Sequence, residues 1–230
     1  MKKFTKMWAI AACALFAGTA AVNAEDYTWK FVTAGDATTY AIRSDGSLWS
    51  WGWNEKGQGG NGVSERTATP TLADGNRVWK KAVGGKAYGF FLAEDGSLWA
   101  AGTHESGVQG TNDGIDHKVL TRIGTDNDWA DMACSRFWGY SGFAIKTNGT
   151  LWAWGENSAG QLGIGNIQAQ TAPVQVGADM DWKQVAAGCS SVLALKTDGS
   201  LWGWGFNMYS ELFGHEGKQL SPVRLGSETD

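Results

Sequence analysis

The chain is poor in the residue types on which metal sites and many active sites depend. Its 230 residues include three cysteines, three histidines and three prolines. The histidines, His104, His117 and His215, lie far apart, and the cysteines form no CxxC pair. Zinc sites and activated nucleophiles need such residues in close groups. We therefore expect no catalytic residues, no metal and no cofactor, and a protein that is not an enzyme.

Long apolar runs are equally scarce. One run, Met7 to Phe16, follows Lys2, Lys3 and Lys6, and Val22-Asn23-Ala24 fits a small-x-small cleavage pattern. Residues 1–24 therefore read as the signal peptide of an exported bacterial protein, periplasmic or secreted. A lipoprotein is a less favoured alternative, because Ile10 to Cys13 only loosely resembles a lipobox and the apolar run continues past it.

Basic clusters are missing as well. Removal of the three leader lysines changes the formal charge from −4 to −7, and no Lys/Arg cluster stands out elsewhere. This argues against nucleic acid or anionic lipid as a partner. No later apolar run is long enough to span a bilayer.

Glycine and tryptophan are abundant instead, with 33 and 14 residues. One pattern occurs four times: SDGSLWSWG at 44–52, EDGSLWAAG at 94–102, TNGTLWAWG at 147–155 and TDGSLWGWG at 197–205. A second tryptophan series precedes it at 29, 79, 129 and 182, and the three prolines share one slot. Residues 25–230 are therefore one domain of four tandem repeats, 29–78, 79–128, 129–181 and 182–230.

Each repeat reads as a small antiparallel sheet of three or four strands. Asp-Gly or Asn-Gly between apolar runs is the strongest hairpin signal, because both turn residues need a positive φ. A further short strand is expected after each proline. Such a sheet cannot bury its faces alone, so the repeats must stack, with indoles filling the gaps and glycines allowing close approach. The fold class is all-β, a propeller-like array of four sheets.

The stretch Asn157 to Gly165, with Gly160, Gln161 and Leu162, resembles the regulator of chromosome condensation repeat. That resemblance covers residues 27–226 and implies a β-propeller, usually of seven blades, that acts as a binding surface. The family includes a nuclear exchange factor for a small GTPase and secreted inhibitors of β-lactamases. This chain departs from the pattern in having Ala101 in place of a second tryptophan and in having four repeats.

Four blades with the wedge of a seven-membered ring would span about 200°. Three outcomes stay open: a tighter closed four-blade ring, an open arc completed by a second copy as a homodimer, or a fragment of a larger ring.

Some aromatic residues are not explained by the repeat. The third repeat carries an insertion, CSRFWGYSG at 134–142, whose Arg136, Phe137, Trp138 and Tyr140 have the composition of an interaction hot spot. They could equally plug the central channel. Trp53, Phe206 and Tyr209 follow the W-x-W strands and could add to a binding surface or pack against a neighbouring repeat. These seven residues are the predicted partner-binding site.

Cys134 and Cys189 lie near equivalent strand ends of adjacent repeats, so a disulfide between them is an open alternative. The favoured function is an exported, non-enzymatic scaffold that binds a protein of unknown identity through its loops. The alternatives are a carbohydrate-binding propeller and a protein inhibitor of a secreted enzyme.

Overall fold

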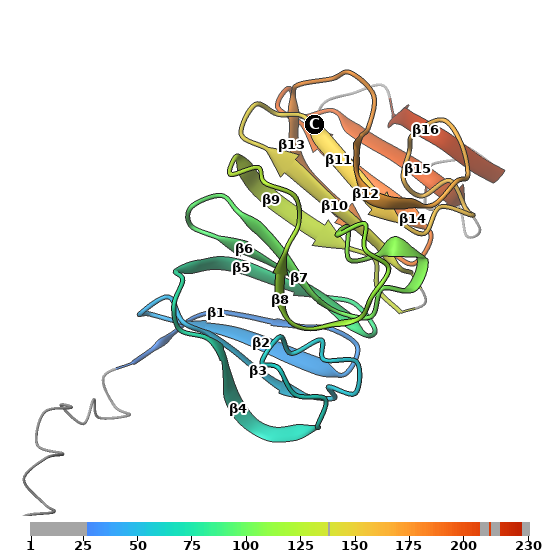
Figure 1. The fold of residues 1–230 in the computed structure, drawn as a ribbon. Coiled ribbons are helices and arrows are strands. Elements are labelled where there is room, and N and C mark those ends of the chain that lie inside the picture. The colour runs from blue at the N-terminus through green and yellow to red at the C-terminus, as the bar shows by residue number, and fades with distance from the viewer. Residues whose placement is uncertain (1–26, 138, 208–211, 213–216, 227–230) are drawn as a thin grey trace, which may run out of the picture.

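The computed structural model describes residues 27–137, 139–207, 212 and 217–226. These residues form four antiparallel sheets of four strands, each in the sequential order of a meander, which we call blades 1 to 4 (Figure 1). The strands of blade 1 are β1 (Trp29–Ala34), β2 (Thr38–Arg43), β3 (Leu48–Gly52) and β4 (Thr67–Asp74). Those of blade 2 are β5 (Trp79–Gly84), β6 (Tyr88–Ala93), β7 (Leu98–Gly102) and β8 (His117–Arg122).

Blade 3 contains β9 (Trp129–Cys134), β10 (Ser141–Lys146), β11 (Leu151–Gly155) and β12 (Gln170–Gln175). Blade 4 contains β13 (Trp182–Ala187), β14 (Ser191–Lys196), β15 (Leu201–Asn207) and β16 (Gly217–Leu225). One short 3-10 helix, η1 (Glu105–Gly107), follows β7. The predicted all-β array of four sheets is confirmed. The prolines lie within β4, β12 and β16, not before them, and these outer strands tolerate a residue without an N–H.

The recurring D-G-S-L-W pattern is explained by a hydrogen-bond relay at each hairpin. In blade 4 the Asp198 carboxylate accepts from the Ser200 N–H at 2.9 Å and from its hydroxyl at 2.6 Å. The same hydroxyl accepts from the Trp202 indole at 2.9 Å. Gly199 between them has φ +87°, which favours glycine. Blades 1, 2 and 3 repeat the relay, with Asn148 and Thr150 as its members in blade 3.

Three apolar clusters lie between successive blades and form the core. The second tryptophan of the W-x-W strand fills two of them. Trp154 donates its indole N–H to the Val108 carbonyl of blade 2 at 2.7 Å, and Trp204 donates to the Gln161 carbonyl of blade 3 at 2.8 Å. Both side chains are fully buried. A large ring that also satisfies a buried carbonyl therefore joins each of these pairs of blades.

A cation lies between two indoles at the hairpin end of three blades. The Lys196 ammonium lies 4.9 Å from the Trp182 ring and 4.6 Å from the Trp202 ring. Asp179 and Asp181, in the linker that precedes the blade, hold it at 2.6 and 3.1 Å. Lys146 has the same arrangement in blade 3, with Asp126 and Asp128. The linker acids thus stabilise the blade that follows them.

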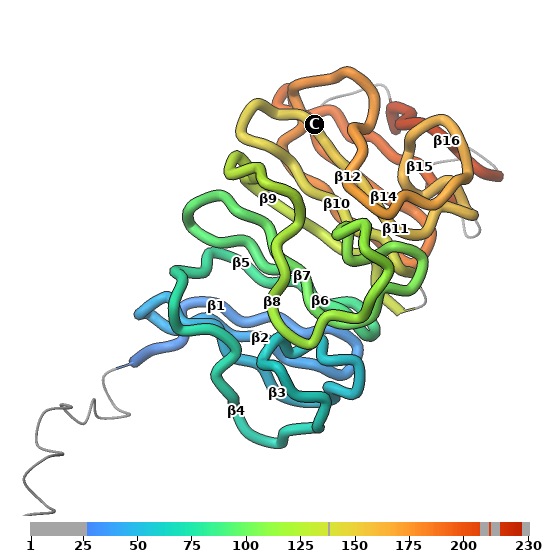
Figure 2. Tube along the Cα trace, viewed as in Figure 1, coloured from blue at the N-terminus to red at the C-terminus, as the bar shows by residue number. Residues whose placement is uncertain are grey.

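The four blades fan out in sequence order, with blades 1 and 4 at opposite ends (Figure 2). The innermost strands, β1, β5, β9 and β13, contact one another in succession. The blades do not close, so the closed four-blade ring is wrong. Bulky rings fill the space between the blades and so set the angle at which they splay, and four such angles fall short of a full turn.

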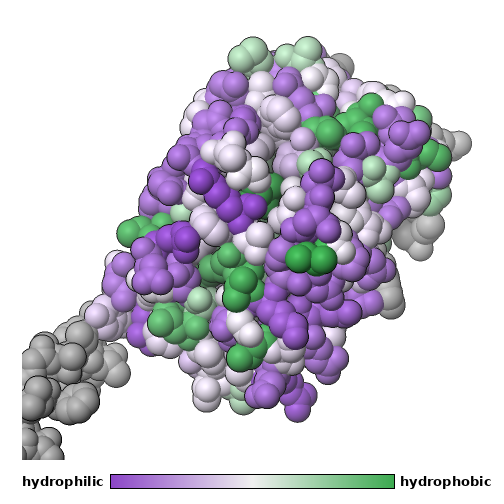
Figure 3. All heavy atoms as spheres, in the orientation of Figure 1, coloured by the Kyte–Doolittle hydropathy of each residue, from purple (hydrophilic) through white to green (hydrophobic). Residues whose placement is uncertain are grey.

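The surface seen in Figure 3 carries its apolar residues in small, separate groups among polar ones. Within the described parts of the chain, the structure contains no helix that is long and apolar enough to cross a bilayer. The predicted signal peptide lies outside the described residues.

Candidate functional site

The insertion predicted in the third repeat is the loop between β9 and β10, residues 135–140, which we call the insertion loop. It reaches both of the outer blades. The Arg136 N–H donates to the Gly188 carbonyl of blade 4 at 3.3 Å. The Phe137 N–H donates to Asp36 Oδ1 of blade 1, also at 3.3 Å. One loop thereby crosses the inner end of the fan.

A buried tyrosine of blade 2 fixes the base of this loop. The Tyr88 hydroxyl donates to the Ser135 carbonyl at 2.8 Å and lies 3.2 Å from the Gly139 carbonyl. A Cβ at Gly139 would collide with Ser135 and with the Cys189 carbonyl, so glycine is required there. Burial raises the pKa of Tyr88 well above its ordinary range, so the hydroxyl remains a donor.

The tip of the loop is presented to solvent. Phe137 is 65% exposed, and Arg136 is exposed beside it. Phe137 also has φ +57°, a left-handed conformation that costs a bulky residue free energy. Such strain is retained at ligand-binding and switch positions when the surroundings impose it. An exposed phenylalanine held in a strained conformation is an unusual surface feature and marks this tip as a binding candidate.

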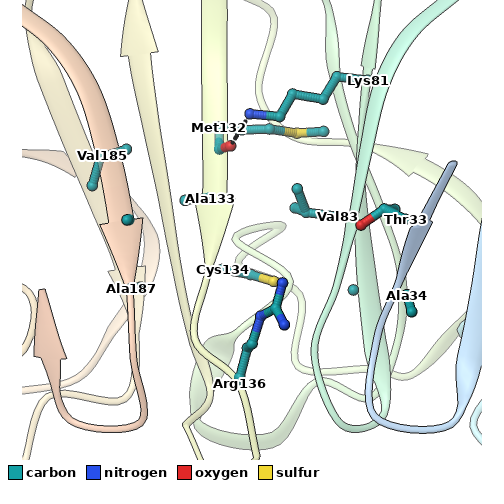
Figure 4. A pocket seen from close by; sticks show the side chains of 12 residues that line it. Thr33, Ala34, Lys81, Val83, Met132, Ala133, Cys134, Arg136, Val185 and Ala187 are labelled. Carbon is teal, nitrogen blue, oxygen red and sulfur yellow. Dashed lines mark hydrogen bonds between the residues drawn. The ribbon is translucent and has the colours of Figure 1, made fainter. Parts of the chain in front are cut away.

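Behind the tip lies a cavity of about 220 Å³, which we call the axial pocket. It is lined by inner strands of all four blades, with Thr33, Val83, Met132 and Val185 among its residues (Figure 4). Arg136 turns from the loop toward the Cys134 sulfur at one end of the pocket (Figure 4). A side chain entering from the insertion loop would therefore meet a guanidinium first.

The axial pocket contains one ammonium that is already paired and one buried thiol. The Lys81 ammonium at its other end is held by Asp131 Oδ1 at 2.5 Å and by the Met132 carbonyl at 2.9 Å. Burial raises the pKa of Cys134 to about 12, so it is a thiol and not a nucleophilic thiolate at neutral pH. Among the described residues, no three His, Cys, Asp or Glu side chains are grouped to hold a metal ion.

The two cysteines are not bridged in the structure. Cys134 is buried at the axial pocket and Cys189 is exposed, and both are free thiols. A bridge between them stays a prediction for the oxidised protein.

The other predicted partner-binding residues divide into packing and surface positions. Tyr140 is partly buried, with its ring 6.0 Å from that of Tyr88, so it supports the loop and is not part of its exposed tip. Trp53 and Phe206 are half-buried. Their N–H groups donate to Ala37 and Ser190, in the loops that flank the insertion loop, which places them at the same end of the propeller. Trp138 and Tyr209 lie outside the described residues.

Sequence reasoning missed Asp36 and Tyr88. Both interact with the insertion loop from other blades, at separations of 101 and 47 residues. Tyr88 gave a weak signal, because a tyrosine buried in a strand usually needs a hydrogen-bond partner. Asp36 is a polar residue in a turn and gave none.

Comparison with protein-family models finds matches to the regulator of chromosome condensation (RCC1) repeat at residues 45–92 and 148–195. A second model of the same repeat matches residues 29–58. The chain belongs to the RCC1 repeat family. The matched segments contain the hairpin relays of blades 1 and 3, together with the strands on both sides of the relay in blade 1 and the strand after it in blade 3, so the geometry and the family patterns agree.

Among curated RCC1-like relatives, the ultraviolet-B receptor UVR8 of Arabidopsis thaliana is 30% identical over 70% of this chain and 37% of its own length. Protein RCC2 of Homo sapiens is 27% identical over 64% of this chain and 19% of its own. The solved structure of Prp20p from Saccharomyces cerevisiae matches with a TM-score of 0.75 or more. The two chains are 22% identical, and the match covers 88% of this chain and 51% of Prp20p. This RCC1-repeat chain thus spans about half or less of the length of these relatives.

Proposed function

We propose that this chain is an exported, non-enzymatic propeller that binds another protein through its insertion loop. The single observation that carries the proposal is the exposed, strained Phe137 beside Arg136, on a loop anchored to three other blades. Loops positioned by a rigid scaffold are common binding elements. A pre-ordered loop also loses little conformational entropy on association.

The family supports binding rather than chemistry. Prp20p binds Gsp1p and histones, and a solved structure contains it bound to Kap60. We do not carry these partners over, because the N-terminal residues of this chain favour export from the cytoplasm.

The chemistry of the loop indicates the kind of partner surface. Phe137 offers an aromatic side chain that an apolar recess would bury, and arginine and aromatic residues are enriched among hot spots. Arg136 at the axial pocket offers a planar donor that suits a carboxylate. The partner surface should therefore combine an apolar recess with an aspartate or glutamate that reaches the axial pocket.

Affinity capture with the full chain as bait, from the envelope and medium of the producing cells, tests this function. We expect at least one protein to be captured by the wild type and lost with Arg136→Ala and with Phe137→Ser. Ile167→Ser, at an exposed loop residue of the same blade, is the matched control and should retain it. An identical set of captured proteins for all variants would contradict the site.

Export is tested separately. Mass spectrometry of the protein recovered from the medium and periplasm should find an N-terminus at Glu25. An intact N-terminus on protein confined to the cytoplasm would contradict export.

A further inference from the structure

Blades 2, 3 and 4 each bury one face against the blade before them. The corresponding face of blade 1 is exposed. The first tryptophan of the blade is 48% exposed at Trp29, but 0%, 4% and 3% exposed at Trp79, Trp129 and Trp182. Three residues later Val32 is 66% exposed, whereas the equivalent Ala82, Met132 and Val185 are buried. Blade 1 therefore presents an apolar face whose counterparts all lie inside interfaces.

This open face already has the geometry of an interface. Trp51 occupies the strand position of Trp154 and Trp204, the two indoles that bind a carbonyl of the preceding blade. Its ring centroid lies 6.2 Å from that of Trp29 at 50°. The buried counterparts in blade 4, Trp182 and Trp204, are 6.1 Å apart at 64°. The indole is thus pre-positioned for a preceding blade.

Blade 4 leaves the complementary face open. A groove of about 150 Å³ on it is lined by Leu193, Leu195 and Leu201 among others. These three side chains are half-buried, whereas their counterparts in blade 3, Phe143, Ile145 and Leu151, are buried against blade 4. The loop of blade 4 begins as in blade 3, with the Leu212 N–H donating to Asn207 Oδ1 at 3.1 Å. The exposed face of blade 1 and the exposed face of blade 4 therefore correspond to the two sides of the interface that successive blades form within the chain.

Charge adds an independent match. Arg43, at the position of Lys146 and Lys196, lies 3.8 Å from the Trp49 ring and 5.0 Å from the Trp29 ring. Within the described part of the chain, no carboxylate forms an ion pair with it, whereas each lysine has two linker aspartates. In the sequence, GSETD at 226–230 aligns with GTDND at 124–128 and GADMD at 177–181. Glu228 and Asp230, outside the described residues, thus hold the register of the acids that a following blade requires.

We propose that blade 4 of a second copy of this chain docks on the open face of blade 1, and that two copies close head to tail. The interface repeats the contacts between successive blades: Trp51 enters the groove of Leu193 and Leu195, and Glu228 and Asp230 pair with Arg43. A heterologous contact of this kind either closes or polymerises. One chain matches 51% of the solved chain of Prp20p, so two copies together amount to about one chain of that length.

The mass of the full chain in solution, as the cell processes it, tests the docking. Sedimentation equilibrium should give two chains per particle. Val32→Lys places a charge on a side chain that is exposed in one copy and buried between two, so it should leave the fold intact and give one chain per particle. Val119→Lys, at a valine of blade 2 that is also more than half exposed, is the matched control and should remain two chains.

A charge exchange tests the register. Arg43→Glu alone should weaken self-association by at least about tenfold, because like charges then meet at both interfaces. The double variant Glu228→Lys, Asp230→Lys should do the same. An equimolar mixture should restore pairs, since each chain then meets its opposite charge on both sides. Restoration by mixing also shows that neither variant is simply misfolded.

Several results would overturn the proposal. These are a wild-type particle of one chain at all concentrations, a larger assembly, a two-chain particle that Val32→Lys leaves unchanged, or variants that fail to pair on mixing. The protein-binding function is tested apart from this, because Phe137→Ser should leave the particle at two chains.

Discussion

The interface between blades 1 and 2 and the interface between blades 3 and 4 each satisfy a buried carbonyl group, but with different residues. In the second, the Trp204 indole of the following blade donates to the Gln161 carbonyl at 2.8 Å. In the first, the corresponding strand position is Ala101, too short to reach across. The Tyr40 hydroxyl, from the same blade as the carbonyl, donates to Gln58 at 3.0 Å instead.

The cations differ in the same way. Blade 4 uses Lys196 from its own strand, whereas blade 2 has Ala93 at that position and uses Arg77 from the preceding linker, 4.0 Å from the Trp99 ring. Asp74 pairs with Arg77 at 3.3 Å and also accepts from the Trp79 indole at 3.1 Å. The repeat therefore preserves a satisfied carbonyl and a cation beside the indoles, and it does not preserve the residues that supply them.

Removing the tryptophan of the second interface should have the largest effect. Trp204→Ala should lower the free energy of unfolding by about 3–5 kcal/mol, because it leaves a cavity and an unsatisfied Gln161 carbonyl. Urea unfolding at one fixed protein concentration measures this. Trp53→Ala, at a half-buried loop tryptophan, is the control and should cost clearly less. Equal losses would mean that the buried indole is not a main contact between blades 3 and 4.

The first interface can be weakened without creating a cavity. Tyr40→Phe removes the hydroxyl that donates to the Gln58 carbonyl and should lower the free energy of unfolding by about 1–2 kcal/mol. The same urea experiment applies. A loss below about 0.3 kcal/mol would show that the carbonyl does not depend on Tyr40.

The cations can be compared through alkaline pH. Burial lowers the pKa of Lys196, but the hydrogen bonds and charges of Asp179 and Asp181 outweigh it and raise the pKa above 10.5. The stabilisation is therefore complete below pH 10.5 and is lost as the pH rises through the raised pKa. Blade 2 uses an arginine, which stays charged there.

We expect Lys146→Arg, Lys196→Arg to flatten the alkaline decline in the free energy of unfolding relative to the wild type. Buried tyrosines contribute to the decline in both proteins, so the difference between the two curves isolates the lysines. Superimposable curves would contradict the role given to the linker acids.

The smallest effect concerns the hairpin relay. Hydrogen bonds from the side chain and backbone of Ser200 lower the pKa of Asp198, so its contribution is present above pH 3.8 and is lost as the pH falls through the lowered pKa. Blade 3 uses Asn148, which does not titrate. Asp198→Asn should retain the turn and slightly reduce the fall in stability between pH 4 and pH 2, read from thermal unfolding. A steeper acid decline in the variant would contradict this assignment.

The sheets and their hairpins could be predicted because their signals are local. Asp-Gly before Ser-Leu-Trp specifies a turn, and both ends of the hydrogen-bond relay lie within five residues. Spacing alone then predicts four units of about 50 residues. The insertion loop could also be found, because residues 136–140 interrupt that spacing.

Closure and the supports of the loop could not be predicted, because they depend on contacts between blades. The splay of the fan depends on how Trp154, Trp204 and the smaller Ala101 fill three separate gaps. Arg77 could not be recognised as the substitute for a missing lysine, since it lies on another element. Asp36 meets Phe137 only after three blades have been stacked.

The placement of the linker acids has a consequence for how such chains can be rearranged. Asp126 and Asp128 belong to blade 2 by sequence period but hold the lysine of blade 3. A gene duplication or graft that begins at the first tryptophan would deliver a blade without its counter-ions. The self-sufficient module for recombination starts five residues earlier, at Gly124 in blade 3 and Gly177 in blade 4, and a library of shuffled blades should place its junctions at these glycines.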